Sequence, residues 1–193
     1  MSNTAKRWVL MSVLSLAAFA QASASSITFP FNTVHTGATP GGPAPWATMT
    51  ITNITGGVQV SLTNSATNPA GQFIRELNLL FNVLPTGFSF ASDPYVQVIN
   101  LGNYIDAGLS FNVEVRFKVA PPGARLLPGN SSNFKLFGVS TANFVGANNS
   151  AMVHIQNIPP GGDSSKVIAP EPGSLIAIGT GLVSLLGLRR RRK

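Results

Sequence analysis

The strongest constraint on the fold is a regular alternation of apolar and polar side chains from residue 111 to residue 119. Successive side chains of an extended chain point to opposite sides, so the alternation gives the segment one apolar and one polar face. The apolar face holds Phe111, Val113, Val115, Phe117 and Val119, and the polar face holds Asn112, Glu114, Arg116 and Lys118. This pattern is typical of an antiparallel strand with a core on one side and water on the other.

Shorter segments of the same kind recur between residues 27 and 168, and Pro, Gly and Asn punctuate the gaps between them. They are residues 48–54, 58–62, 77–83, 95–99, 134–139 and 152–158. Gly56 and Gly57 stand between the first two, which indicates a hairpin. Residues 73–83 could also form a short helix, but their alternation favours a strand. Residues 37–45 are expected to form a loop, since they are rich in Gly and Pro.

We therefore predict an all-β chain with a single antiparallel β-sandwich, jelly-roll-like and of about eight strands, over residues 25–162. Residues 163–172 are predicted to be a linker. The two ends of the chain have the patterns of targeting segments.

Residues 1–24 have the three parts of a secretory signal peptide. Lys6 and Arg7 supply the positive start, and an apolar run from Trp8 to Ala20 follows. The small residues Ala22, Ser23 and Ala24 come next, so cleavage by signal peptidase is expected between Ala24 and Ser25. An uncleaved anchor is the alternative, although the apolar run is short for a membrane span of about 20 residues.

The C-terminal segment begins with Pro170, Glu171 and Pro172. The prolines prevent a helix across this triplet and leave the chain extended, in a form that a processing enzyme can bind. Residues 173–188 carry no charge and are expected to form a transmembrane helix of roughly 24 Å. The chain ends in a basic tail, expected on the cytoplasmic side, of Arg189, Arg190, Arg191, Arg192 and Lys193.

The triplet, the apolar helix and the terminal arginines together resemble the PEP-CTERM sorting signal, over residues 169–193. That resemblance implies recognition by an exosortase, a membrane-embedded cysteine protease-transpeptidase of Gram-negative bacteria that also make exopolysaccharide. It implies brief anchoring in the inner membrane, removal of the tail near the triplet, and transfer of the domain to the cell surface or extracellular matrix. A plain tail-anchored envelope protein is the alternative.

The net charge of +7 reflects these ends and not the domain. Lys6, Arg7 and the five residues of the basic tail supply seven of the 13 basic residues, and the rest of the chain has 13 − 7 = 6 basic residues against six acidic ones. Between the ends the chain is therefore neutral, and we expect no nucleic-acid partner.

The chain has few residues that could carry chemistry. It has no Cys, which excludes thiol catalysis, Cys-ligated zinc and disulfides. His35 and His154 are its two histidines, and neither has metal-ligand spacing. Asp93 and Asp106 stand alone, so a calcium ion would need mostly backbone ligands. We therefore expect no enzyme, metal or cofactor, although clustering of these acids with Glu76 or the histidines would favour one.

Uncharged polar strands with exposed aromatic rings can bind sugars, because the rings stack on the sugar while amide groups bond to its hydroxyls. The candidate glycan contacts are Trp46, Tyr95 and Tyr104, although all three could instead be packing residues. The scarcity of reactive residues favours a non-enzymatic protein, and the PEP-CTERM resemblance implies a place at the cell surface or in the matrix, in association with exopolysaccharide and biofilm. A carbohydrate-binding module for that exopolysaccharide is the alternative, which requires the three rings to share one exposed face.

Overall fold

The computed structural model describes residues 26–145 and 149–170. The predicted signal peptide, with its cleavage site at Ala22, Ala24 and Ser25, lies outside these residues, as do the predicted transmembrane helix and basic tail. Within the described ranges there are eleven strands and two short 3-10 turns. The strands are β1 (Ser26–Phe31), β2 (Thr33–Gly37), β3 (Ala47–Ile54), β4 (Gly57–Asn64), β5 (Phe73–Leu79), β6 (Gly87–Ser89), β7 (Val96–Asp106), β8 (Leu109–Phe117), β9 (Ser131–Phe137), β10 (Ala151–Ile158) and β11 (Asp163–Ile168). The turns are η1 (Pro122–Ala124) and η2 (Thr141–Asn143).

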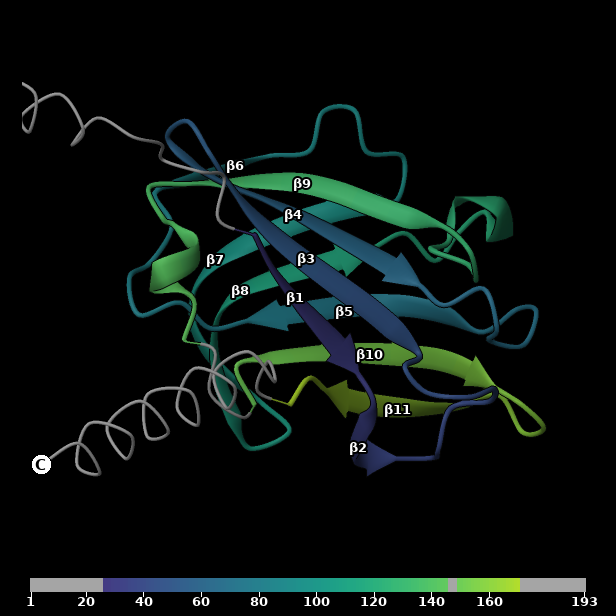
Figure 1. Cartoon of the computed structure of the whole chain (residues 1–193). Helices are drawn as coiled ribbons and strands as arrows, with labels where there is room; N and C mark the ends of the chain where they lie inside the picture. The colour runs from purple at the N-terminus through teal and green to yellow at the C-terminus, as the bar shows by residue number, and fades with distance from the viewer. Residues whose placement is uncertain (1–25, 146–148, 171–193) are drawn as a thin grey trace, which may run out of the picture.

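The strands form two antiparallel sheets that pack face to face (Figure 1). Sheet A has the strand order β1-β3-β4-β9-β6, and sheet B has the order β2-β11-β10-β5-β8-β7. Three hairpins, β3–β4, β7–β8 and β10–β11, pair within one sheet. The all-β class and the two-sheet sandwich predicted from the sequence are confirmed.

The core lies between the sheets and follows the alternation of the sequence. In β8, Val113, Val115 and Phe117 are fully buried and belong to the core cluster. The Phe144 ring meets Phe29 and Phe81 edge to face, with ring centroids 4.9 and 5.3 Å apart. Such edge-to-face contacts stabilise a core beyond the effect of burying the apolar area of the rings. The hairpin of residues 48–62 is confirmed as β3–β4, and the strand expected in residues 73–83 is confirmed over β5, which ends at Leu79 and leaves residues 80–83 outside it.

Two predictions from the sequence are wrong: the number of strands and the start of the linker. The described residues form eleven strands and not about eight, because β1, β2, β6 and β11 carry weak or short apolar patterns. Residues 163–168 were predicted to be linker but form β11, which pairs with β10 on one side and β2 on the other. The Asp-Ser-Ser-Lys sequence is polar, so its strand conformation comes from pairing with both neighbours and not from local propensity. The folded domain therefore extends to Ala169, whose amide donates to the Ala151 carbonyl.

Among the described residues, no helix has the length and apolar character needed to cross a membrane.

Candidate functional site

The outer faces of the two sheets differ in chemistry. Outward positions of sheet A carry hydroxyls that pair across the strands. Thr28 lies 3.0 Å from Thr50, and Thr63 lies 2.7 Å from Ser131, measured between the hydroxyl oxygens. The outer face of sheet B instead holds the charged side chains of Glu76, Glu114, Arg116 and Lys166. Charged and amide groups that meet on one face make sheet B the candidate functional surface.

The tip of the β7–β8 hairpin lies across this face. β8 pairs with β5 from Arg116 only as far as Val113, and β7 has an irregular register between Leu101 and Tyr104. An irregularity of this kind bends a strand and redirects the residues after it. At the tip, the Ala107 carbonyl lies 3.0 Å from His35 Nε2 on β2. β2 and β7 are the opposite edges of the six-stranded sheet, about 24 Å apart, so the hairpin reaches across the sheet to contact β2.

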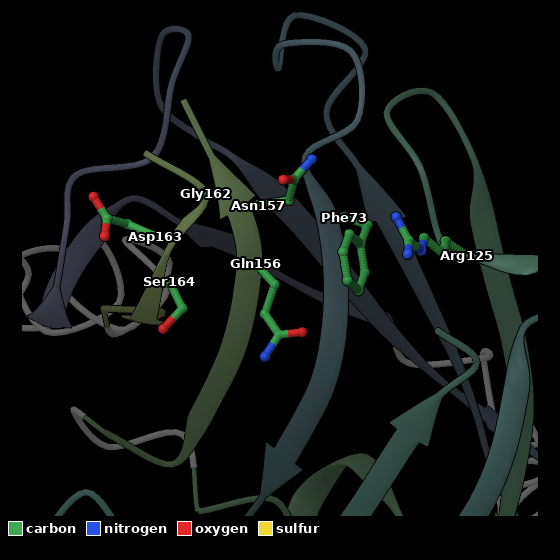
Figure 2. Close-up of a pocket in the computed structure, with 7 residues that line it drawn as sticks. All are labelled: Phe73, Arg125, Gln156, Asn157, Gly162, Asp163 and Ser164. Atoms are coloured by element: carbon green, nitrogen blue, oxygen red, sulfur yellow. The ribbon is translucent and has the colours of Figure 1, made fainter. Parts of the chain in front are cut away.

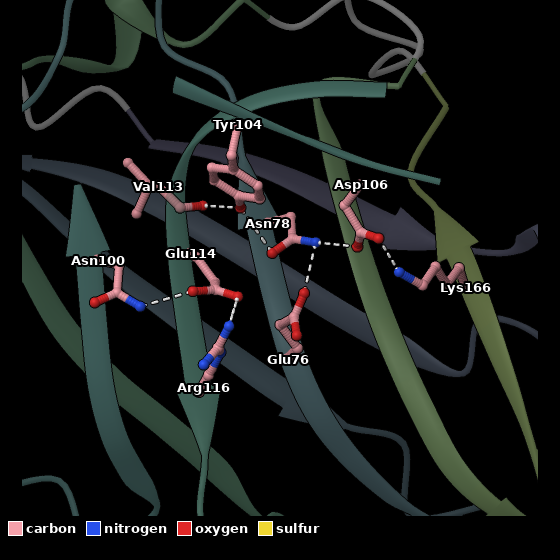
Figure 3. A network of polar contacts seen from close by, with 9 residues as sticks. All are labelled: Glu76, Asn78, Asn100, Tyr104, Asp106, Val113, Glu114, Arg116 and Lys166. Carbon is pink, nitrogen blue, oxygen red and sulfur yellow. Dashed lines mark hydrogen bonds and ion pairs between the residues drawn. The ribbon is translucent and has the colours of Figure 1, made fainter. Parts of the chain in front are cut away.

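Asn78 connects this hairpin to the sheet (Figure 3). Its Nδ2 donates to Glu76 Oε1 and to Asp106 Oδ2, both at 2.8 Å. Its Oδ1 accepts from the Tyr104 hydroxyl at 2.8 Å, and that hydroxyl also lies 3.0 Å from the Val113 carbonyl. Asn78 is only 1% exposed, although its side chain points away from the core. The hairpin therefore covers the site, and a single buried amide joins two carboxylates and a phenol.

Ion pairs surround this centre. Asp106 also pairs with Lys166 of β11. Glu114 accepts from Arg116 at 2.7 Å and from Asn100 Nδ2 at 2.7 Å. Each of the three carboxylates thus has a donor, in an arrangement that holds the hairpin against sheet B.

Two groups on this face have altered pKa values. Burial raises the pKa of Glu76 above its ordinary value, and the nearby carboxylates of Glu114 and Asp106 raise it further, against the opposing effect of the Asn78 bond. Burial lowers the pKa of His154, and Lys166 beside it lowers that pKa further. Glu76 is therefore easier to protonate than a free glutamate, and His154 is harder to protonate than a free histidine.

The raised pKa of Glu76 gives a prediction about pH. The folded protein binds a proton at Glu76 more tightly than the unfolded chain, so this stabilising contribution is present below about pH 4.5 and is lost as pH rises through the folded pKa. Glu76→Gln removes the ionisation and keeps the acceptor for Asn78. We expect a higher urea midpoint than the parent at pH 7, and a smaller difference at pH 4. Glu114→Gln, which weakens the Arg116 pair, is the control and should not stabilise at pH 7. If Glu76→Gln instead lowered the urea midpoint by the same amount at both pH values, the raised pKa of Glu76 would be contradicted.

The three candidate aromatic residues do not share one exposed face, so the condition set above for a carbohydrate-binding module built on these rings is not met. Trp46 is 7% exposed and belongs to the core, and its Nε1 donates to the Gly42 carbonyl at 3.0 Å. Tyr95 packs against the same core at the start of β7. Tyr104 belongs to the β7–β8 hairpin itself, and its hydroxyl donates to Asn78 Oδ1. The alternation of apolar and polar residues does not show that these rings are covered, because all three lie at the ends or irregularities of strands.

The structure brings only part of the predicted acid and histidine set together. Glu76, Asp106 and His154 lie on the outer face of sheet B, whereas Asp93 accepts backbone amides of Tyr95 and Val96 at 2.8 and 2.9 Å. His35 lies on β2 and contacts the hairpin tip. In the described part of the chain, no three His, Cys, Asp or Glu side chains are grouped so that they could hold a metal ion.

A groove of about 470 Å³ lies one row further along the same face (Figure 2). Phe73, Gln156 and Ser164 form its floor, since they are direct neighbours across β5, β10 and β11. Asp163 lies at one end of the groove and Arg125 at the other. The Arg125 guanidinium lies 4.6 Å above the Phe73 ring, and its Nε donates to the Val119 carbonyl at 2.8 Å.

The sequence did not single out Asn78, Lys166 or the groove residues. The spacing of Glu76 and Asn78, two apart on a strand, places both on one face, but the covering hairpin has no local sign in the sequence. Comparison of the chain with protein-family models, with curated proteins and with solved structures gave no match.

Proposed function

We propose that this chain is an exported, non-enzymatic β-sandwich protein of the cell surface or extracellular matrix of a Gram-negative bacterium. An exosortase sorts it through the PEP-CTERM tail, and the released domain associates with exopolysaccharide. Within the proposal, the sandwich is jelly-roll-like, since seven of the ten connections between consecutive strands pass from one sheet to the other.

The observation that supports this proposal is the position of the folded domain between the two expected cuts. β1 (Ser26–Phe31), the first described strand, follows the expected new N-terminus at Ser25. β11 ends at Ile168, and the Ala169 amide still bonds to the Ala151 carbonyl, directly before Pro170. Cleavage at Ala24 and near Pro170 therefore leaves every described strand in the product, so release does not require unfolding.

Intact mass tests the two cuts. The protein is recovered from the medium and from the washed envelope of a producing host, with and without exosortase. We expect a chain from Ser25 to about Pro170 when the exosortase is present, and residues 25–193 in the envelope when it is absent. Residues 25–193 found only in the envelope of both hosts would instead identify a plain tail-anchored protein.

Two variants test the recognition element. Glu171→Ala, or deletion of residues 189–193, removes part of it, and we expect unprocessed protein to accumulate at the inner membrane. Lys135→Ala changes an exposed charge on sheet A and serves as the matched control, which should be processed normally. Normal release of both tail variants would overturn the sorting proposal.

The non-enzymatic part of the proposal is supported by how the carboxylates are used. Glu76 and Asp106 both accept from the Asn78 amide, and Glu114 is engaged by Arg116 and Asn100. A catalytic pair of carboxylates needs room for a substrate between them. Here the Asn78 amide and the hairpin occupy that space.

A further inference from the structure

The groove on the outer face of sheet B has three polar groups that the protein leaves without partners. No described residue bonds to the Gln156 amide, the Ser164 hydroxyl or the Asp163 carboxylate. Asp163 and Ser164 are exposed and Gln156 is half-buried, so a ligand can reach all three. By contrast, the carboxylates of Glu76, Asp106 and Glu114 on the same face all have bonding partners within the protein.

These groups are held in a fixed row. Gln156 stands opposite Phe73 in the β5–β10 ladder and opposite Ser164 in the β10–β11 ladder. Neighbouring strands lie about 4.8 Å apart, so the row extends over about 10 Å. At its end, Arg125 stacks on the Phe73 ring, which is 5% exposed, and its terminal amino groups have no hydrogen-bond partner among the described residues.

We propose that this groove binds a segment of a neutral polysaccharide. A sugar hydroxyl both donates and accepts, so it can satisfy Asp163, which only accepts, and Arg125, which only donates. The Gln156 amide and the Ser164 hydroxyl between them can do both. The opposite charges at the two ends cancel, which favours a neutral chain over a polyanion. This proposal rests on the proposed association of the domain with exopolysaccharide. It gives that association a binding site and a class of ligand.

Affinity gel electrophoresis of the processed protein tests the site. The gels contain the exopolysaccharide of a producing strain, neutral dextran or polyanionic alginate. If the tail is not processed, the full-length protein is used in detergent, so that a failure of sorting is not read as a failure of binding. We expect retardation in the exopolysaccharide and dextran gels, little changed by salt, and none in alginate.

The variant Gln156→Ala/Ser164→Ala removes the centre of the row, and we expect its affinity for the retarding polysaccharide to fall at least tenfold. Gln59→Ala, an exposed glutamine on the outer face of sheet A, is the matched control and should bind as the parent does. Equal thermal unfolding of all three proteins shows that folding is unchanged; if the double variant unfolds earlier, Asp163→Asn replaces it, with the same expectation of weaker binding. Retardation by alginate alone, no retardation in any gel, or equal binding by parent and variant would overturn the proposal.

Discussion

Asn78→Ala is expected to lower the free energy of unfolding by about 3 kcal/mol, because it removes buried bonds to charged groups. The change leaves Glu76 and Asp106 without the Nδ2 donor and Tyr104 without the Oδ1 acceptor, at a position 1% exposed. Domains of this kind are stable by only about 5–15 kcal/mol, so the loss is a large fraction of the total. Urea unfolding at pH 7 measures it, and hydrogen exchange should show faster opening in residues 104–111.

The control for Asn78 is Asn100→Ala. Asn100 also donates to a carboxylate on the same face, Glu114, but it is exposed, so its removal should change stability by less than about 0.5 kcal/mol. Asn78→Asp places a third carboxylate beside Glu76 and Asp106. We expect that variant to be unstable at pH 7 and to recover as the pH falls. Equal effects of Asn78→Ala and Asn100→Ala would show that the hairpin does not depend on the buried amide.

Gly57→Ala is expected to destabilise the domain by about 3 kcal/mol, because an added methyl group has no space. A Cβ at this position would lie 2.1 Å from the Leu136 carbonyl oxygen and 2.9 Å from Phe137 Cα, both backbone atoms of β9. Gly57 pairs with Phe137 at the start of the β4–β9 ladder. The clash can be relieved only if β4 moves away from β9, at the centre of sheet A. Thermal unfolding measures the loss.

Gly56→Ala is the matched control for Gly57. Gly56 has φ of +78° in the turn, and a Cβ there meets no atom within 4 Å. Its cost is therefore only that of a left-handed alanine, about 1 kcal/mol. If Gly56→Ala were the more damaging variant, the close approach of β4 and β9 at Gly57 would not be what requires glycine.

The class of the fold could be predicted because burial on one face forces a period of two along each strand. Phe111 to Val119 shows this most clearly: Val113, Val115 and Phe117 lie in the core as expected, whereas Phe111 is buried outside the core cluster and Val119 lies beyond the end of β8. The same rule failed for β11, because Ser164 and Lys166 belong to a strand that is held by both neighbours and needs little apolar surface of its own.

The candidate site could be predicted only in part. The sequence placed Glu114 and Arg116 on a polar face, and the structure pairs them there. It could not place Asp106 beside Asn78 and Lys166, since these residues lie on β7, β5 and β11 and meet only after the hairpin folds over the sheet. The buried aromatic residues show the same limit, because the sequence makes Trp46 a candidate contact residue, whereas its ring lies in the core.

By itself, the sequence determined the all-β class, the main strands and the targeting patterns at both ends, since these depend on local order along the chain. The tertiary structure decided which strands are neighbours, where the β7–β8 hairpin lies, and that Gln156, Ser164 and Phe73 form one groove. Contacts between residues far apart in sequence depend on sheet order and strand register, and these are set by the packing of the whole domain and not by any local pattern.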